Sequence, residues 1–153
     1  MNQNAQEKII SFIQEHPLVV IGTVSASNKP FGAAVYMGVD TEMNLYFLTK
    51  SETDKSKNIL ENCYVSVTVT DEPSQTTLKL RGEASRLISQ DEHEKAMSSL
   101  GAVKRAVGDW LPPLPKIHAG YYIVYKITPQ FAKLSTYTNR HLEEGPVSVE
   151  YRA

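Results

Sequence analysis

Residues 45–67, LYFLTKSETDKSKNILENCYVSV, decide the predicted fold of this chain. The stretch has the pattern of an apolar strand, a polar turn, a short lysine-rich helix and a second apolar strand. Its turn places hydroxyls and lysines where the helix begins. A helix start carries free backbone N–H groups and a partial positive charge, which suit a phosphate monoester. The stretch therefore predicts a strand–helix–strand unit with an anion site at the helix start.

The candidate phosphate contacts are hydroxyls and lysines of this unit. They are Thr49, Lys50, Thr53, Lys55 and Lys57, in a motif that also contains Ser51 and Ser56. Thr53 can cap the helix or give its hydroxyl to a phosphate, and the lysines supply charge. The simpler interpretation is a solvated helix start with surface lysines, where Asp54 offsets part of the positive charge. The residues alone leave both interpretations open.

The composition is that of an ordinary globular domain. Hydrophobic residues make up 41% of the 153 residues and charged residues 22%, which predicts one domain over residues 1–153 with a real core. The net charge of −1 gives no global field to attract nucleic acid or a membrane surface. The single cysteine, Cys63, excludes an intrachain disulfide and a multi-cysteine metal site. The polar N-terminus and the lack of an apolar run of about 20 residues predict cytoplasmic residence.

The remaining sequence predicts a mainly β fold of the α+β class. Strands are expected at residues 18–25, 31–39, 45–49, 64–70, 76–88, 121–128 and 131–135. Helices are expected at residues 4–15, 54–61, 89–100 and 102–110. Pro129 should separate the last two strands, and Gly82 should mark a bend or bulge. Six or seven strands, several in hairpin order, predict a small antiparallel barrel with peripheral helices. The polar tail from Thr138 is expected to be loosely held or packed on a partner.

Residues 18–67 resemble the flavin-binding half of the pyridoxamine 5′-phosphate oxidase-like family of split β-barrels. The family's motifs are a Gly/Pro turn, a strand ending in aromatic-x-Thr, a Ser-Arg-Lys helix start and a Leu-x-x-Asn pattern. The matching segments are Asn28-Lys29-Pro30, Tyr46-Phe47-Leu48-Thr49, Thr53-Asp54-Lys55, and Ile59 with Asn62. Residues 80–88, LRGEASRLI, are similar to the family's next strand, so the resemblance covers roughly two-thirds of the chain. Each motif is only moderately specific, and their order and spacing carry the weight.

The chain also departs from the family pattern. The family's arginine on the second strand and the lysine at its end fall at Ala33 and Gly38, and the arginine of the helix start falls at Asp54. In the family's enzyme the final segment carries an arginine and a histidine for pyridoxal phosphate, and here the final segment, PVSVEYRA, is without that pattern. The resemblance therefore implies a divergent member rather than the oxidase itself.

The resemblance implies an FMN-binding flavoprotein with oxidoreductase activity, in which the flavin carries out the hydride or electron transfer. It implies a homodimer with flavin mononucleotide (FMN) in clefts between subunits, and the tyrosine- and valine-rich strand at 121–128 favours the same assembly. The flavin ring is expected against the backbone of Ala34, Val35 and Tyr36, where small side chains permit close approach. A small-molecule substrate or electron donor would stack on the exposed ring face. No nucleic-acid or membrane partner is expected, and the sequence names no catalytic acid or base.

Two other functions stay open. One is a non-catalytic flavin- or haem-binding module, a sensor or store on the same fold. The other is a scaffold that has lost its cofactor, which Ala33 and Gly38 favour. The histidines show no spacing typical of a metal site, so no metal is expected. They are His16, His93, His118 and His141. Trp110, before LPPLP, can cover a flavin face or pack in the core or a dimer contact.

Overall fold

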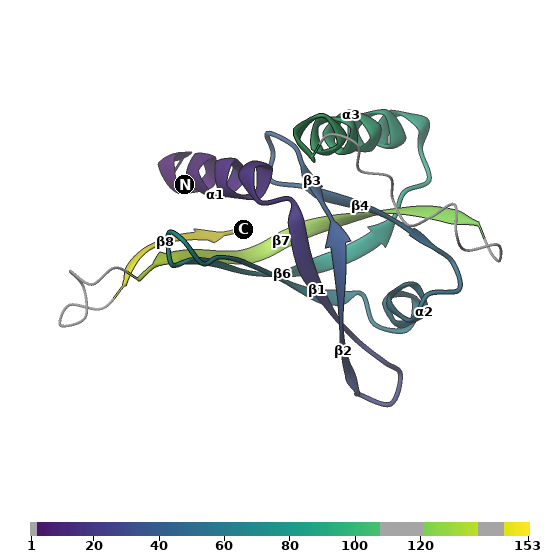
Figure 1. Cartoon of the computed structure of the whole chain (residues 1–153). Coiled ribbons are helices and arrows are strands. Elements are labelled where there is room, and N and C mark those ends of the chain that lie inside the picture. The colour runs from purple at the N-terminus through teal and green to yellow at the C-terminus, as the bar shows by residue number, and fades with distance from the viewer. Residues whose placement is uncertain (1–2, 108–120, 138–145) are drawn as a thin grey trace.

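The computed structural model describes residues 3–107, 121–137 and 146–153. In these residues, one antiparallel sheet of eight strands curls into a half-barrel, and three helices pack around it (Figure 1). The helices are α1 (Gln3–Glu15), α2 (Asp54–Glu61) and α3 (Gln90–Val107). The strands are β1 (Leu18–Val24), β2 (Pro30–Tyr36), β3 (Gly38–Val39), β4 (Leu45–Lys50), β5 (Tyr64–Asp71), β6 (Thr76–Arg86), β7 (Tyr122–Thr136) and β8 (Val147–Arg152). The predicted mainly β, antiparallel split barrel with peripheral helices is confirmed.

The strand order explains why the barrel is split. The order is β2-β1-β5-β6-β7-β4-β3, and β8 pairs with β7. The two ends of this order, β2 and β3, are consecutive in the chain, and only Met37 lies between them. One bent stretch therefore pairs with β1 through its first part and with β4 through its second part. The sheet is split at this bend, because β2 and β3 each keep one edge that no described strand pairs.

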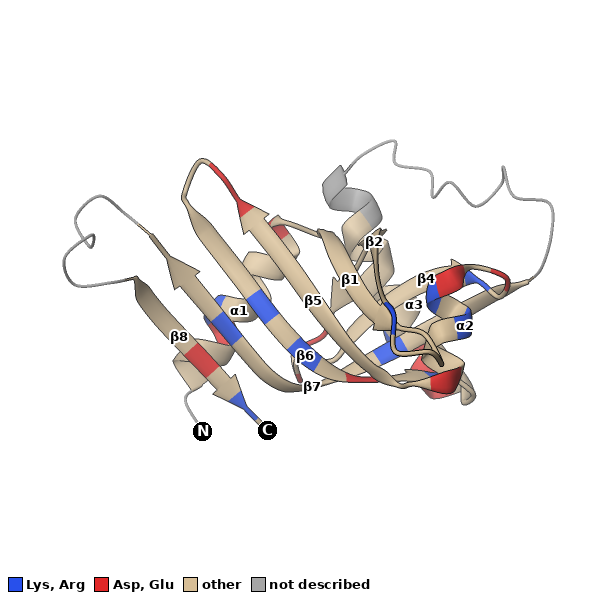
Figure 2. Ribbon diagram, turned by 90° about the horizontal axis from the view of Figure 1, so that it is seen from below, with Lys and Arg blue, Asp and Glu red and all other residues tan. Residues whose placement is uncertain are grey.

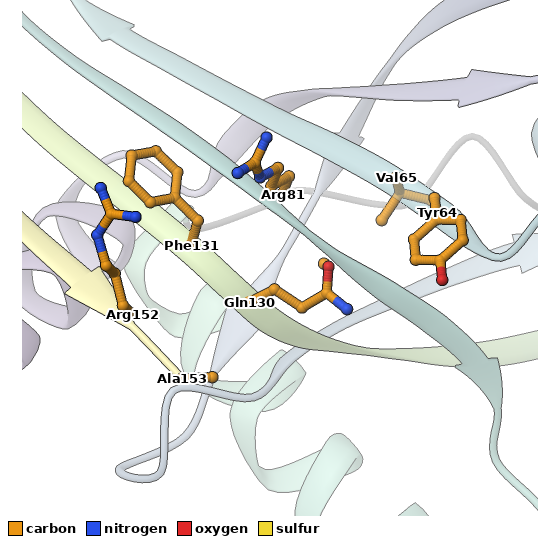
Figure 3. Close-up of a pocket in the computed structure, with 8 residues that line it drawn as sticks. Tyr64, Val65, Arg81, Gln130, Phe131, Arg152 and Ala153 are labelled. Carbon is orange, nitrogen blue, oxygen red and sulfur yellow. The ribbon is translucent and has the colours of Figure 1, made fainter.

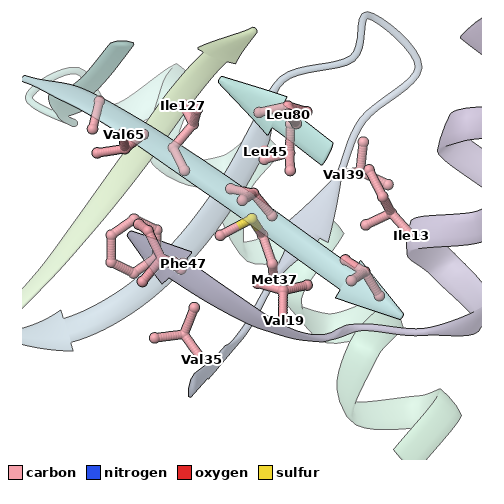
Figure 4. Packing of buried hydrophobic residues seen from close by; sticks show 14 of the residues in the cluster. Ile13, Val19, Val35, Met37, Val39, Leu45, Phe47, Val65, Leu80 and Ile127 are labelled. Carbon is pink, nitrogen blue, oxygen red and sulfur yellow. The ribbon is translucent and has the colours of Figure 1, made fainter. Parts of the chain in front are cut away.

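The main hydrophobic core fills the inside of the curled sheet. Alternate residues of a strand point inward, and Val65, Val67 and Val69 of β5 are accordingly buried between exposed neighbours. The helix α1 packs against β3, β7 and β8 and buries Ile9 and Ile13 completely. Figure 4 shows side chains from strands far apart in the sequence meeting in this core. Each buried aliphatic side chain contributes roughly 1.5–3 kcal/mol, so this core dominates the stability of the fold.

The helix α3 covers the other face of β4 and β7. Its Ala96 packs with Tyr46 of β4 and Val124 of β7 in a second, smaller cluster. Gly38 of β3 lies against the same helix, because a Cβ built on it would come 2.7 Å from the Ser99 carbonyl carbon. The packing of α3 therefore leaves no room for a side chain at Gly38.

The strand β7 differs from the expected pair of strands broken at Pro129. It runs without a break through this proline, and its register with β6 shifts between Arg81 and Gly82. Gly82 lies opposite Pro129 and Arg81 lies opposite Phe131, so Gln130 is the extra residue of a bulge. Proline is tolerated there because the hydrogen-bond ladder is locally interrupted. The bend or bulge expected at Gly82 is confirmed, and a Cβ there would overlap a backbone carbonyl oxygen of β7.

The structure corrects two more expectations. The tail does not stay loose, because residues 147–152 form β8 along β7. The two helices expected at 89–100 and 102–110 are one helix, α3, as far as Val107, and Trp110 lies outside the described residues. No helix within the described ranges is long and apolar enough to cross a bilayer.

Candidate functional site

The expected anion site lies where β4 ends and α2 begins (Figure 1). The turn between them is fixed to the start of β7. The Ser51 N–H donates to the Tyr121 carbonyl at 2.9 Å, and Ser51 Oγ accepts from the Tyr121 N–H at 3.3 Å. The helix is fixed by Ser56, whose buried hydroxyl shares a 2.8 Å hydrogen bond with the Tyr125 hydroxyl. The predicted strand–helix–strand unit is present, and both its turn and its helix are held against β7.

Thr49 and Thr53 are hydrogen-bonded to each other at this helix start. Thr53 is the N-cap residue of α2, but its side chain makes no capping bond. Its hydroxyl donates instead to the Lys50 carbonyl at 2.8 Å. Thr49, which is 2% exposed, therefore gives its own proton to the Thr53 oxygen at 3.1 Å. Because Thr53 does not cap the helix, the first N–H groups of α2 are left for another acceptor, such as an anion.

Lys55 is the lysine best placed to meet such an anion. The Asn58 amide of the same helix donates to Thr23 Oγ1 of β1 at 3.0 Å. Residues three apart share a helix face, so Lys55 lies on the side of α2 that packs against β1 and β2. Its side chain is half-buried, and burial lowers the pKa of its ammonium, an effect that Asp54 partly opposes. A desolvated cation gains more from an anionic partner than an exposed cation does.

The other two candidate lysines point elsewhere. Neighbouring residues of a strand face opposite sides of the sheet, so Lys50 points away from Thr49. The Lys50 ammonium lies 5.2 Å from the centroid of the Tyr122 ring, on the outer face of the sheet. Lys57 is exposed, and a step of two residues turns it about 200° around the helix from Lys55. The five predicted candidates therefore do not converge on one point, although all carry positive charge or hydroxyls near the same helix start.

The strand β2 supplies small side chains and an open backbone edge. Ala34 is exposed and lies opposite Val20 of β1, whereas Val35 points into the core and is 8% exposed. Only the backbone of Val35 can therefore face a ligand, while Tyr36 ends the strand with a half-buried side chain. No described strand pairs with the second edge of β2, although the strand also contacts α2 and β4.

The departures from the family pattern have structural counterparts. Ala33 packs against the main core, and Gly38 is covered by α3. A long basic side chain at either position would displace packed neighbours. Asp54 lies in the first turn of α2, where it complements the helix dipole but lowers the positive charge of the site.

Glu52 gives the same turn an acceptor that lacks a donor. Its Oε2 accepts from the Ser51 hydroxyl at 3.1 Å, whereas Oε1 is buried and has no hydrogen-bond partner among the residues that the structure describes. An unsatisfied buried oxygen is costly, and a hydroxyl-bearing ligand in this turn would satisfy it. The helix N–H groups and Lys55 therefore suit an anion, and this carboxylate suits a hydroxyl donor in the same turn.

Sequence reasoning missed the structural roles of three residues that build the site. Ser56 lies three positions before the buried Ile59, and this helical spacing would have predicted its inward direction. Tyr125 was expected to pack the barrel or the subunit interface, and its hydroxyl also anchors α2. No feature of the sequence distinguishes Glu52 from a surface carboxylate.

The chain was compared with protein families and known structures. A family model described as pyridoxamine 5′-phosphate oxidase matches residues 5–130, whereas no curated protein matches the chain. General Stress Protein 26 from Bacillus anthracis is 22% identical, with 84% of this chain and 92% of that chain covered and a TM-score of 0.63. PhzG from Burkholderia lata, solved with tetrahydrophenazine-1-carboxylic acid, is 11% identical, with 96% and 90% covered and a TM-score of 0.62. The haem storage protein HutZ from Vibrio cholerae is 18% identical, with 80% and 88% covered and a TM-score of 0.60. These structures share the fold.

Proposed function

Because the chain belongs to the pyridoxamine 5′-phosphate oxidase family, we propose that it is an FMN-binding flavoprotein with oxidoreductase activity. The observation that carries this proposal is the uncapped start of α2, on the helix that also presents the half-buried Lys55. A helix start and a desolvated lysine supply the N–H donors and the charge that a phosphate monoester needs. Riboflavin lacks that phosphate, so the two flavins distinguish this site from a general flavin pocket.

In this proposal the α2 N–H groups and Lys55 hold the phosphate. Thr49 and Thr53 turn their hydroxyls from each other toward it, and the two remaining lysines of the unit strengthen the positive potential. The backbone of residues 34–36 lines the flavin ring, because the side chains there are small or turned away. Bound FMN would supply the hydride or electron transfer. No acid or base of the chain is assigned a role.

The proposal includes a homodimer that takes a small-molecule substrate or electron donor in an open cleft. An apolar patch on the outer face of β1 and β2 supports this assembly, since Leu18 is 54% exposed, Val20 is 50% exposed and Ala34 lies opposite Val20. The strand at residues 121–128, from which the sequence predicted a dimer, offers less surface to a second subunit, because its Val124 and Tyr125 are buried within the subunit. A cytoplasmic location belongs to the proposal as well, since the one cysteine is free.

The absorbance spectrum of the purified protein tests the proposal, followed by titration with FMN and with riboflavin. We expect flavin absorbance bands and an affinity for FMN about tenfold or more above that for riboflavin, the value of a charge-assisted hydrogen bond. Equal affinities would refute the phosphate site, and failure to take up either flavin would refute the flavoprotein. Reduced nicotinamide should bleach the flavin bands, whereas a store would keep them. A light-scattering mass near the single-chain 17.1 kDa would refute the dimer.

One histidine favours a second candidate function, a haem-binding store. His93 Nδ1 lies 2.8 Å from the Ser89 carbonyl oxygen, and because a carbonyl only accepts, this nitrogen carries the proton. The other ring nitrogen keeps its lone pair, an arrangement typical of metal-binding histidines. His93 lines a hollow of about 520 Å³ with apolar Leu48 and Val124 and the cationic Arg86, which can pair with a propionate. The described residues hold no cluster of three or more metal-binding side chains, but haem iron requires only one such ligand.

Titration with haemin separates this candidate from the flavoprotein. We expect a shifted haem absorbance band that His93→Ala abolishes. His16→Ala is the matched control, because His16 lies against the Phe12 ring at 4.6 Å between centroids and lines no hollow with His93. Haemin binding that survives His93→Ala unchanged would remove this candidate.

A further inference from the structure

The outer face of β6, β7 and β8 carries a row of basic and aromatic residues. Arg81 of β6 lies opposite Phe131 of β7, and Phe131 lies opposite Arg152 of β8. Lys79 and Lys133 form the next row of the same face. Figure 2 shows basic residues as neighbouring bands across this part of the sheet. Because the whole chain has a net charge of −1, this positive surface is a local feature.

The bulge in β7 opens a hollow beside this row (Figure 3). Two residues of β7 lie against one of β6 there, so both Gln130 and Phe131 border the hollow. Gln130 is held in place because its Nε2 donates to Glu83 Oε1 at 2.7 Å. Tyr64, which is 58% exposed, borders the side away from Arg152. The hollow measures about 530 Å³, a volume in the range of small-molecule sites.

Both guanidinium groups rest against the same phenyl ring. The Cζ atoms of Arg81 and Arg152 lie 5.3 Å and 5.1 Å from the Phe131 ring centroid. These cation–π contacts restrict two long side chains before any ligand arrives. Arg152 also pairs with Glu150 at 3.3 Å, whereas Arg81 makes no ion pair within the described parts of the chain. A planar guanidinium with unused N–H groups is the side chain best suited to bind a carboxylate through two parallel hydrogen bonds.

We propose that this hollow binds a small planar aromatic carboxylate. The carboxylate pairs with Arg81, with Arg152 as a second nearby cation, and the aromatic part of the ligand packs against Tyr64 and Phe131. An inorganic anion would use the charge alone and make no apolar contact with Tyr64 or Phe131. The site is separate from the start of α2, because strands β5 to β8 build it and Lys55 does not line it. The proposal therefore does not depend on flavin binding.

Isothermal titration calorimetry with 2-naphthoate tests this site, with 2-naphthamide as the uncharged ligand of the same shape. We expect the amide to bind about tenfold or more weakly, and Arg81→Gln to weaken naphthoate binding by about ten- to a hundredfold. Lys79→Gln is the matched control, because it removes the same charge from the same strand and face outside the hollow. Binding within about twofold of the wild type is expected for it. Equal binding of the amide, or equal losses in the two variants, would overturn the proposal.

A second variant tests the aromatic part of the site. Phe131→Leu keeps an apolar side chain but removes the ring that holds both guanidinium groups, so naphthoate binding should weaken while the circular dichroism spectrum stays unchanged. Inorganic phosphate at equal concentration should not displace naphthoate. Unchanged binding in Phe131→Leu, displacement by phosphate, or a hollow covered by a second copy of the chain and closed to naphthoate would each overturn the proposal.

Discussion

The hydrogen bond between Ser56 and Tyr125 should be measurable as an energetic coupling between the two residues. The two hydroxyls lie 2.8 Å apart, and their residues are 0% and 1% exposed. Ser56→Ala leaves the tyrosine hydroxyl buried without a partner, and Tyr125→Phe does the same to the serine while keeping the ring contact with Phe47. An orphaned buried hydroxyl costs about 1–3 kcal/mol. For a chain of this length each single variant should therefore lower Tm by roughly 2–10 °C.

The double variant supplies the decisive measurement. It removes both hydroxyls together and leaves no orphan, so its loss of stability should fall about 1–2 kcal/mol short of the sum of the single losses. Alanine also favours the helix more than serine does, but this gain is the same in the Ser56→Ala single variant and in the double variant, so it cancels when their losses are compared. Urea unfolding of the four proteins gives the free energies. Strictly additive losses would refute the claim that this bond anchors α2. Thr70→Val is the control, because its hydroxyl pair with Thr77 is exposed at 3.3 Å, and its loss should stay within about 0.5 kcal/mol.

Four further outcomes are expected at the proposed flavin site and the bulge. Lys55→Met should weaken FMN binding about tenfold or more and leave riboflavin binding unaffected, whereas Lys57→Met, at an exposed position, should change neither affinity much; fluorescence titration measures both. Because the pKa of Lys55 is lowered in the folded protein, the flavin-free protein should gain stability as the pH rises toward 10.5, which urea unfolding measures. Ala34→Leu adds bulk on β2 and should abolish flavin absorbance while leaving the fold intact. Full flavin occupancy in this variant would show that the ring does not lie against β2. Gly82→Ala should cost about 1–3 kcal/mol or more by thermal unfolding, whereas Gly32→Ala, with only an ordinary contact at 3.6 Å, should be tolerated.

Local patterns predicted those elements whose formation depends on neighbouring residues. The helix 54–61 and the inward valines of β5 follow from periodicity alone. The continuity of β7 through Pro129 could not be predicted in that way, because it depends on the register that β6 imposes from the other side of the bulge. The strand β8 could have been predicted, because its sequence VSVEYR alternates apolar and polar residues. Only its pairing with β7 could not be predicted from these six residues.

In the candidate site, too, the features set by neighbouring residues could be predicted and those set by distant residues could not. The positions of Thr49 and Lys55 near a helix start could be predicted from the order of residues, because they belong to one strand–helix unit. Strand alternation could also have predicted that Lys50 and Thr49 face opposite sides of the sheet. It could not have predicted that Lys50 lies over the Tyr122 ring. The anchor of α2 joins residues 69 positions apart, and no single-sequence pattern connects such a pair.

The seam between β4 and β7 has a consequence for the order of folding. It pairs residues from the first third of the chain, such as Leu45, with residues from the last third, such as Ile127. The β1–β2 and β5–β6 hairpins join near neighbours and can form early, whereas the seam must wait for a long loop to close, which costs chain entropy before any contact offsets it. The helix α2 docks on Tyr125 only when β7 is in place. We therefore expect the anion site to be among the last parts to form during refolding, on the millisecond-to-second timescale of nonlocal β topologies.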